Sequence, residues 1–306
     1  MQKRIDIFEK SYYNKRREIR FYILKGDLYM KQFKVGVQLY SVRDEMEKDM
    51  YKTLKAIKEM GYDYVEFAGY YGKTAEEVKA MLDEFDLKAI SVHQSYDLFL
   101  EKGQEAVDYL KTIGAKYSAI PWMGPENHKG SENFDKAVAD IKKVAKLLKD
   151  NGIAMLYHNH DFEFEKVDGK FKLDWLYETI PADLLQTEID TCWVHYAGYD
   201  PADYLLKYTG RAPVVHLKDF VCEKLGAGPV YALIGSDGKE EKKASKEETG
   251  FKFAPCGDGI QDFTKILDAA EKAGAEYVIV EQDQTYDLPS LEAVKKSREY
   301  LKTLGQ

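Results

Sequence analysis

Short apolar runs alternate with longer amphipathic segments from residue 33 to the end of the chain. Each run is about four to seven residues long and lies between turn-forming or charged residues, which is typical of buried strands. We therefore predict eight strands, at Phe33–Leu39, Tyr64–Phe67, Leu87–His93, Tyr117–Pro121, Ile153–His158, Leu184–Asp190, Pro213–Leu217 and Glu276–Glu281.

The segments between these strands have the spacing of amphipathic helices. In Met46–Met60 the apolar side chains recur about once per helical turn, and Gly61 follows as a C-cap. Thr74 and Glu77 form the capping-box pattern at the start of the next helix. The other predicted helices are Thr74–Phe85, Ala106–Ile113, Asn133–Asp150, Leu173–Ile180, Asp200–Tyr208, Asp262–Ala273 and Leu291–Leu304.

This alternation predicts an α/β fold. Strands that alternate with helices form parallel βαβ units, and eight such units in about 270 residues fit a closed (β/α)8 TIM barrel. A doubly wound open sheet is the alternative. It is disfavoured because Gln38–Arg43 follows the first strand, where such folds have a glycine-rich phosphate loop. We predict one barrel domain over residues 33–306.

Two segments fall outside the regular alternation. Residues 1–32 carry nine Lys/Arg against four Asp/Glu, in a chain that is acidic as a whole. We interpret them as an N-terminal extension, which is either the product of a start codon upstream of Met30 or an extra helix or contact arm. Val221–Phe253, with a charge run at Lys239–Lys246, is too long for an ordinary connection. It predicts an insertion after the seventh strand, as an active-site loop or a small hairpin.

Composition narrows the class of partner. Among 306 residues, 44% are hydrophobic and 32% are charged, and the net charge is −8. An acidic chain argues against binding to nucleic acid or to an anionic membrane. Three scattered cysteines give no disulfide framework, which favours a reducing cytoplasm. No apolar run reaches the ~18 residues of a membrane span, and no signal-peptide core precedes the barrel.

The predicted strand ends concentrate metal-binding residue types. The fifth strand ends at His158, and His160 points the same way because side chains alternate along a strand. Three later strands end at Asp190, His216 and Glu281. Any one of these residues could simply cap its strand or face solvent. Four in succession indicate one shared site, since active sites of barrels lie at the C-terminal ends of the strands.

Imidazole and carboxylate ligands together favour Mn²⁺, Zn²⁺, Co²⁺ or Fe²⁺ over Ca²⁺. Such an ion can polarise a carbonyl group while a nearby carboxylate removes the proton on the adjacent carbon. We therefore expect a divalent metal, with Mn²⁺ first and Zn²⁺, Co²⁺ or Mg²⁺ as alternatives.

Other strand ends supply further candidates with two interpretations each. Glu66 and His93 either transfer protons or pair with neighbours inside the barrel mouth. Lys218 either contacts the substrate or pairs with a carboxylate such as Asp219.

Substrate contacts are expected from the remaining polar and aromatic strand ends. Trp122 and Trp193 either stack on a sugar or pack at the mouth of the barrel. Gln38 ends the first strand. With Lys218, these are the predicted substrate-binding residues.

Seven segments of the chain are specific enough to compare with known families: VGVQLYSVRDE, MGYDYVEFAGYYG, YHNHDFEF, EIDTCWVHYAGYDP, GRAPVVHLKDF, CGDGIQDFTKIL and YVIVEQD. Together they resemble the xylose isomerase-like barrels of the sugar phosphate isomerases/epimerases, over Phe33 to Leu304. That superfamily includes ketose 3-epimerases, inosose dehydratases and the endonuclease IV fold. An endonuclease is disfavoured here because the chain is acidic.

The resemblance implies metal ligands at Asp190, His216 and Glu281, with a fourth at the end of the fifth strand. In the epimerases this fourth ligand is usually a glutamate that also acts as acid and base. Here His158 stands at that position. The segment YHNH is more similar to the YHPH of the inosose dehydratases, which implies elimination from a keto-sugar or keto-cyclitol.

The leading hypothesis is therefore a cytoplasmic, metal-dependent sugar or keto-sugar isomerase, epimerase or lyase in carbohydrate metabolism. Elimination is favoured, as in a dehydratase or a 3-keto-glycoside or C-glycoside lyase, and epimerisation is the alternative. Glu281 would remove the proton, and His160, Glu66 or His93 would donate one. A hypothesis of another class is a non-catalytic, metal-binding subunit of a hetero-oligomer. The expected partner is a small carbohydrate or cyclitol, with homo- or hetero-oligomers both open.

Overall fold

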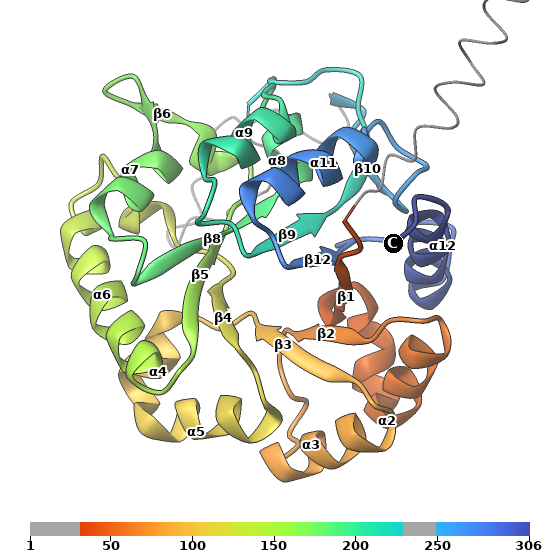
Figure 1. Cartoon of the computed structure of the whole chain (residues 1–306). Coiled ribbons are helices and arrows are strands. Elements are labelled where there is room, and N and C mark those ends of the chain that lie inside the picture. Colours follow the sequence, from red (N-terminus) through yellow and green to blue (C-terminus); the bar gives the residue numbers. More distant parts are fainter. Residues whose placement is uncertain (1–30, 229–248) are drawn as a thin grey trace, which may run out of the picture. The chain divides into compact units, whose positions relative to one another are not determined.

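A computed structural model describes residues 31–228 and 249–306. Its main sheet holds eight parallel strands that follow one another around a ring in the order β3-β2-β1-β12-β9-β8-β5-β4 (Figure 1). Each predicted strand is present, with its ends shifted by a residue or so. The bounds are β1 Lys34–Gln38, β2 Tyr64–Phe67, β3 Lys88–Val92, β4 Tyr117–Ile120, β5 Ala154–His158, β8 Leu185–Asp190, β9 Val214–Leu217 and β12 Tyr277–Val280.

The two end strands of this order, β3 and β4, also meet. A parallel bridge joins His93 to Ala119. The backbone N–H of Lys116 donates to the carbonyl of Ile90 at 3.0 Å, and that of Gln94 donates to the carbonyl of Ala119 at 2.9 Å. These contacts close the ring, so the predicted (β/α)8 barrel is confirmed.

Helices surround the strands because each has one apolar face (Figure 1). In α6 most of the apolar residues, among them Val138, Ile141 and Leu148, are buried. The capping box of Thr74 and Glu77 is formed at the start of α3. The helices around the barrel are α2 Arg43–Glu59, α3 Ala75–Glu84, α4 Tyr96–Lys102, α5 Gln104–Ile113, α6 Phe134–Asp150, α7 Lys172–Thr179, α8 Thr191–Tyr196, α9 Pro201–Lys207, α11 Phe263–Ala273 and α12 Ser290–Thr303.

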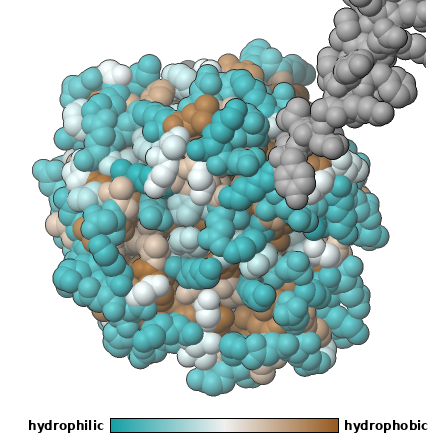
Figure 2. All heavy atoms as spheres, viewed as in Figure 1, coloured by the Kyte–Doolittle hydropathy of each residue, from teal (hydrophilic) through white to brown (hydrophobic). Residues whose placement is uncertain are grey.

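The outer faces of these helices are polar. Figure 2 shows mostly hydrophilic residues on the face in view, with smaller groups of apolar residues between them. In the part of the chain that the structure describes, no helix is long and apolar enough to cross a membrane.

The interior of the barrel is filled by side chains that point inward from alternate strand positions. One buried cluster consists of Ile90, Ala119, Leu156, Val214, Tyr277 and Ile279. Gly36 makes room for it, because a Cβ at this position would lie 2.6 Å from Cδ1 of Ile279. This apolar packing supports the strands below their C-terminal ends.

Two short antiparallel pairs of strands lie outside the main sheet. β10 (Asp219–Val221) pairs with β11 (Lys252–Ala254), so the described ends of the predicted insertion form a hairpin. The rest of that insertion, residues 229–248, and most of the predicted N-terminal extension, residues 1–30, lie outside the described residues. The second pair, β6 (Lys166–Val167) with β7 (Lys170–Phe171), was not predicted, nor were α4 and α8.

Candidate metal centre and active site

Four predicted metal ligands come together at the C-terminal ends of their strands. Nε2 of His158 lies 3.3 Å from Oδ2 of Asp190 and 3.4 Å from Oε2 of Glu281. Nδ1 of His216 lies 2.9 Å from the same oxygen of Glu281. All four side chains are buried. We call them the outer group.

The convergence follows from the pleat and the register of the barrel. His158, His216 and Glu281 each stand two residues after an inward-facing apolar residue, so they point into the barrel as well. Asp190 is paired in register with His216 across β8 and β9. Four adjacent strands therefore aim their last inward side chains at one point.

The outer group fits a divalent cation. Metal–ligand bonds of about 2.0–2.2 Å place neighbouring ligand atoms about 3 Å apart, as these nitrogens and oxygens are. Among the described residues, Nε2 of His158 is buried without a hydrogen-bond partner, and Oδ2 of Asp190 is contacted by Nζ of Lys218 at 2.9 Å. Convergent, buried donor atoms that do not satisfy one another are expected where an ion binds.

A buried lysine neutralises part of this group. Nζ of Lys218 lies 2.9 Å from Asp190, 2.8 Å from Glu281 and 3.1 Å from Asp283. Burial opposes the charge, but these carboxylates raise the pKa of Lys218 well above its usual range. Lys218 thus pairs with carboxylates of the site. Asp219 instead accepts backbone hydrogen bonds from residues 257, 259 and 261.

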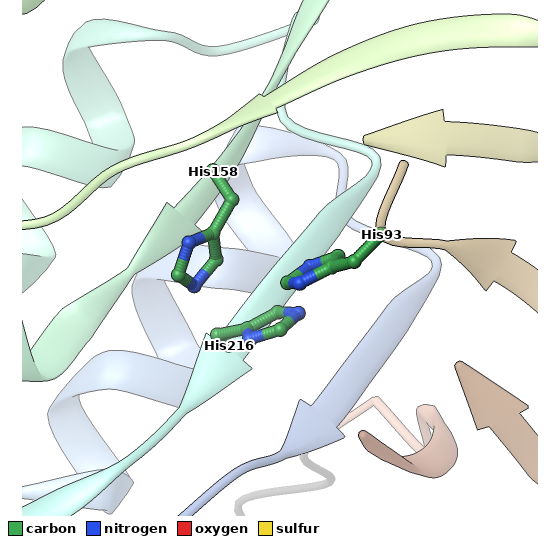
Figure 3. Close-up of side chains that lie close together, drawn as sticks. All are labelled: His93, His158 and His216. Carbon is green, nitrogen blue, oxygen red and sulfur yellow. The ribbon is translucent and has the colours of Figure 1, made fainter. Parts of the chain in front are cut away.

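A second group of donors lies on the other side of the His216 ring. It consists of Glu66, His93, Glu188 and Nε2 of His216, and we call it the inner group. Nε2 of His216 is 2.9 Å from Oε2 of Glu66 and 3.6 Å from Oε2 of Glu188. Nε2 of His93 is 3.1 Å from Glu66 and 2.9 Å from Glu188. Gln38 donates to Glu66 at 2.8 Å. Figure 3 shows how the rings of His93, His158 and His216 approach one another from β3, β5 and β9.

Glu188 lies inside β8, so the pattern of ligand-type residues at strand ends did not predict it. It precedes Asp190 by two residues and therefore points into the barrel with it. That alternation was the available signal. Burial lowers the pKa of His93, but Glu66 and Glu188 raise it to about 10. The ring is therefore protonated and charged at neutral pH as long as no metal ion is bound to it.

His160 lies in the segment that follows β5. The backbone N–H of His160 donates to Glu163 at 2.8 Å, and the hydroxyl of Tyr157 donates to the same carboxyl at 2.6 Å. The ring stacks on Phe162 with centroids 5.5 Å apart. Burial, with the charges of His158 and Lys218, holds the pKa of His160 well below its usual range. The imidazole is therefore neutral at pH 7.

The two candidate tryptophans have different surroundings. Trp193 is fully buried in an aromatic cluster with Tyr196, Phe251 and other residues, and its ring centroid is 5.3 Å from Nζ of Lys218. Trp122 follows β4 and is 41% exposed. For both, contact with a substrate stays a prediction, and only Trp122 offers open surface to one.

The fold and site together define the class of protein: a (β/α)8 barrel whose polar side chains gather at the C-terminal ends of its strands. The chain belongs to the xylose isomerase-like TIM barrel family, whose model matches residues 54–304. The predicted resemblance is confirmed.

Individual relatives agree with this assignment. An inosose dehydratase from Clostridium beijerinckii is 27% identical over 281 residues, which cover 81% of this chain and 88% of the relative. A solved sugar phosphate isomerase/epimerase from Parabacteroides distasonis has a TM-score of 0.70 at 22% identity, covering 89% of this chain and 98% of that chain. A solved IolI protein with a bound zinc atom has a TM-score of 0.65 at 15% identity, covering 89% and 97%. The two structures show the fold alone, and the curated relatives confirm the prediction of an enzyme.

Proposed function

We propose that the protein is a divalent-metal-dependent enzyme that isomerises, epimerises or dehydrates a keto-sugar or keto-cyclitol, with elimination favoured. The observation that carries the proposal is the outer group, in which four buried donors from adjacent strands converge within 4.8 Å of one another. Relatives named inosose dehydratase support the class of substrate and the preference for elimination.

His158, Asp190, His216 and Glu281 would hold the ion. When bound, a divalent metal would supply Lewis acidity that polarises a substrate carbonyl and acidifies the adjacent C–H. We propose Mn²⁺ first, with Zn²⁺, Co²⁺ or Mg²⁺ as alternatives. The zinc atom of the IolI structure supports a divalent ion in this fold without fixing its identity.

The protein's own groups would position the charges and move the protons. Lys218 holds Asp190 and Glu281 from one side. Burial opposes ionisation, but Lys218 and His158 hold the pKa of Glu281 well below its usual range. Glu281 is thus ionised at pH 7, as a proton acceptor must be. We assign it the removal of the proton next to the carbonyl.

His160 would assist the departing oxygen. Because its ring is neutral at pH 7, His160 would first accept the proton that Glu281 removes from the substrate and would then donate it to the departing oxygen, so that the oxygen leaves as water and both side chains return to their starting states. Gln38 and Glu66 would hold His216 in place through a chain of contacts from Nε2 of Gln38 to the ring. Carboxylates that bind the far side of a ligand histidine usually serve this purpose.

The experiment is incubation of the purified, metal-loaded chain with a panel of keto-sugars and keto-cyclitols, including an inosose, in D₂O. NMR would follow exchange at the carbon next to the carbonyl and the formation of products. Loss of water or of a leaving group supports elimination. Interconversion of two epimers without such loss supports the epimerase alternative. Absence of turnover until a partner is added would favour the non-catalytic subunit.

A further inference from the structure

We propose a second divalent-cation site behind the first. Its ligands are the four members of the inner group: Glu66, His93, Glu188 and Nε2 of His216. The two sites share the His216 ring, which presents Nδ1 to the outer group and Nε2 to the inner group. The inner site is distinct from the proposed catalytic ion, although it uses one of the same side chains.

The geometry of the inner group suits an ion as well as that of the outer group does. Its four donor atoms lie within 4.8 Å of one another. The approaches of His93 to the two glutamates, at 2.9 and 3.1 Å, and of His216 to Glu66, at 2.9 Å, are close to the spacing of ligands around a divalent ion. Two imidazoles and two carboxylates form a donor set that transition metals and zinc accept.

Hydrogen bonds account for only part of this convergence. His93 is hydrogen-bonded to Glu188. Nε2 of His216 is buried and lies 2.9 Å from Oε2 of Glu66, an oxygen that also accepts a hydrogen bond from Gln38. Oε1 of Glu66 and Oε1 of Glu188 are buried and unsatisfied within the same described part of the chain. Buried carboxylates with open lone pairs are costly unless something else binds them.

The balance of charge does not decide between one ion and two, so the proposal rests on the geometry of the donor atoms. Of the five carboxylates that belong to the two groups or contact Lys218, three are fully buried, Glu281 is 4% exposed and the side chain of Asp283 is 13% exposed, while Lys218 is the buried lysine that faces them in the described residues. One divalent ion in the outer group leaves a net negative charge, and a proton on His93 offsets only one unit of it. A second divalent ion adds two units of positive charge, but the proton on His93 and the N–H proton of His216 are lost when both rings bind it, so the net charge is the same with one ion or with two. The carboxylates are Glu66, Glu188, Asp190, Glu281 and Asp283.

Binding at both nitrogens requires the His216 ring to release its remaining N–H proton to solvent. If only one ion binds, the ring keeps that proton and Glu66 serves only as the support for His216 that is proposed above. The two interpretations predict different numbers of bound ions, which makes them separable without any measurement of activity.

The test is equilibrium dialysis of the full chain against Zn²⁺, and separately Mn²⁺, followed by elemental analysis of ions per chain. We expect two ions for the wild type, and one for Glu188→Gln or His93→Gln. Asp190→Asn should retain the inner ion and lose the outer one. Asp174→Asn is the matched control: this buried carboxyl bonds Tyr204 and Tyr208 elsewhere in the barrel, so the variant should bind two. Circular dichroism checks that each variant is folded.

Each result separates the inner site from the proposed function. One ion in the wild type, lost in Asp190→Asn and kept in Glu188→Gln, overturns the inner site and leaves the proposed function standing. One ion with the opposite dependence supports the inner site and overturns the outer assignment. Loss of a single ion in both variants also overturns the two-ion proposal, and absence of binding overturns both sites.

Discussion

The two ends of the barrel interior are built from the same strands but have opposite chemistry. In β9, Val214 belongs to the apolar cluster and His216, two residues later, is a candidate ligand. In β12 and the residue after it, Ile279 and Glu281 divide in the same way. Burial of the apolar end stabilises the barrel, whereas burial of charged groups costs free energy unless ions or partners neutralise them. Fold and function are thus separated by two residues along each strand.

Removal of a ligand of the outer group should give the largest loss of activity, with little change in the stability of the fold. We expect Asp190→Ala, His216→Ala and Glu281→Ala each to weaken metal binding and to lower kcat/KM by at least about 100-fold, since even supporting residues of metal sites commonly contribute about 10–100-fold. The measurements are metal content, turnover and thermal melting. Full metal occupancy in the Asp190 and His216 variants would contradict the assignment of the ligands.

A substitution at the apolar end of the barrel interior should have the opposite effect, lowering stability without loss of metal. Leu156→Ala in β5 should lower the free energy of unfolding by roughly 3 kcal/mol, because it leaves a cavity in a fully buried layer. The folded variant should keep its complement of bound ions. Urea unfolding and elemental analysis check the two halves of this prediction. A loss of metal from the folded variant would show that the two ends are coupled.

The stability of the fold should fall in acid, partly because of His128 in a loop that follows β4. His128 is buried, and burial lowers its pKa from 6.5 to about 4 while Nε2 contacts the carbonyl of Met123. The unfolded chain therefore takes up a proton before the folded chain does. The stability contributed by the neutral ring is complete above pH 6.5 and is lost as pH falls toward 4, by up to about 3 kcal/mol.

His128→Gln keeps a donor for Met123 but cannot be protonated. Over pH 6.5 to 4 the variant should therefore lose about 3 kcal/mol less stability than the wild type, as measured by urea unfolding at each pH. Parallel pH profiles for the two proteins would contradict the assignment.

The supporting residues around the ligands should give the smallest effect. Gln38→Ala removes the hydrogen bond to Glu66 and, through it, one restraint on His216. We expect metal affinity to fall by about 10-fold with little change in the melting temperature. Competition with a chelator measures this shift, and an unchanged affinity would show that Gln38 does not restrain the ligand.

The sequence predicted most of this arrangement because strand periodicity and strand ends are local signals. The ends of β5, β8, β9 and β12 are marked by histidines and acids, so the outer group could be read directly. The role of Glu188 could not be predicted, because it lies inside its strand and its environment depends on which residues face it across the barrel. The β6–β7 hairpin did have a signal: Asp168-Gly169 adopts positive φ at both positions, as a tight hairpin turn requires.

Short helices were harder to predict. α8 spans only Thr191–Tyr196 and begins where the side chain of Asp190 accepts the backbone N–H of Cys192. Periodicity over so few residues is weak, and the helix depends on tertiary contacts. The partners of Lys218 could not be predicted either, because three carboxylates from different segments come close to it only in the folded barrel.

The most direct test of the central claim is the fate of the substrate proton in D₂O with a keto-cyclitol such as an inosose. The wild-type, metal-loaded enzyme should exchange the proton next to the carbonyl and release water. Glu281→Gln should abolish the exchange, and His160→Ala should slow product formation more than exchange. Exchange that persists in Glu281→Gln at the wild-type rate would contradict the assignment of this residue. Turnover by wild type fully depleted of metal would contradict the account as a whole.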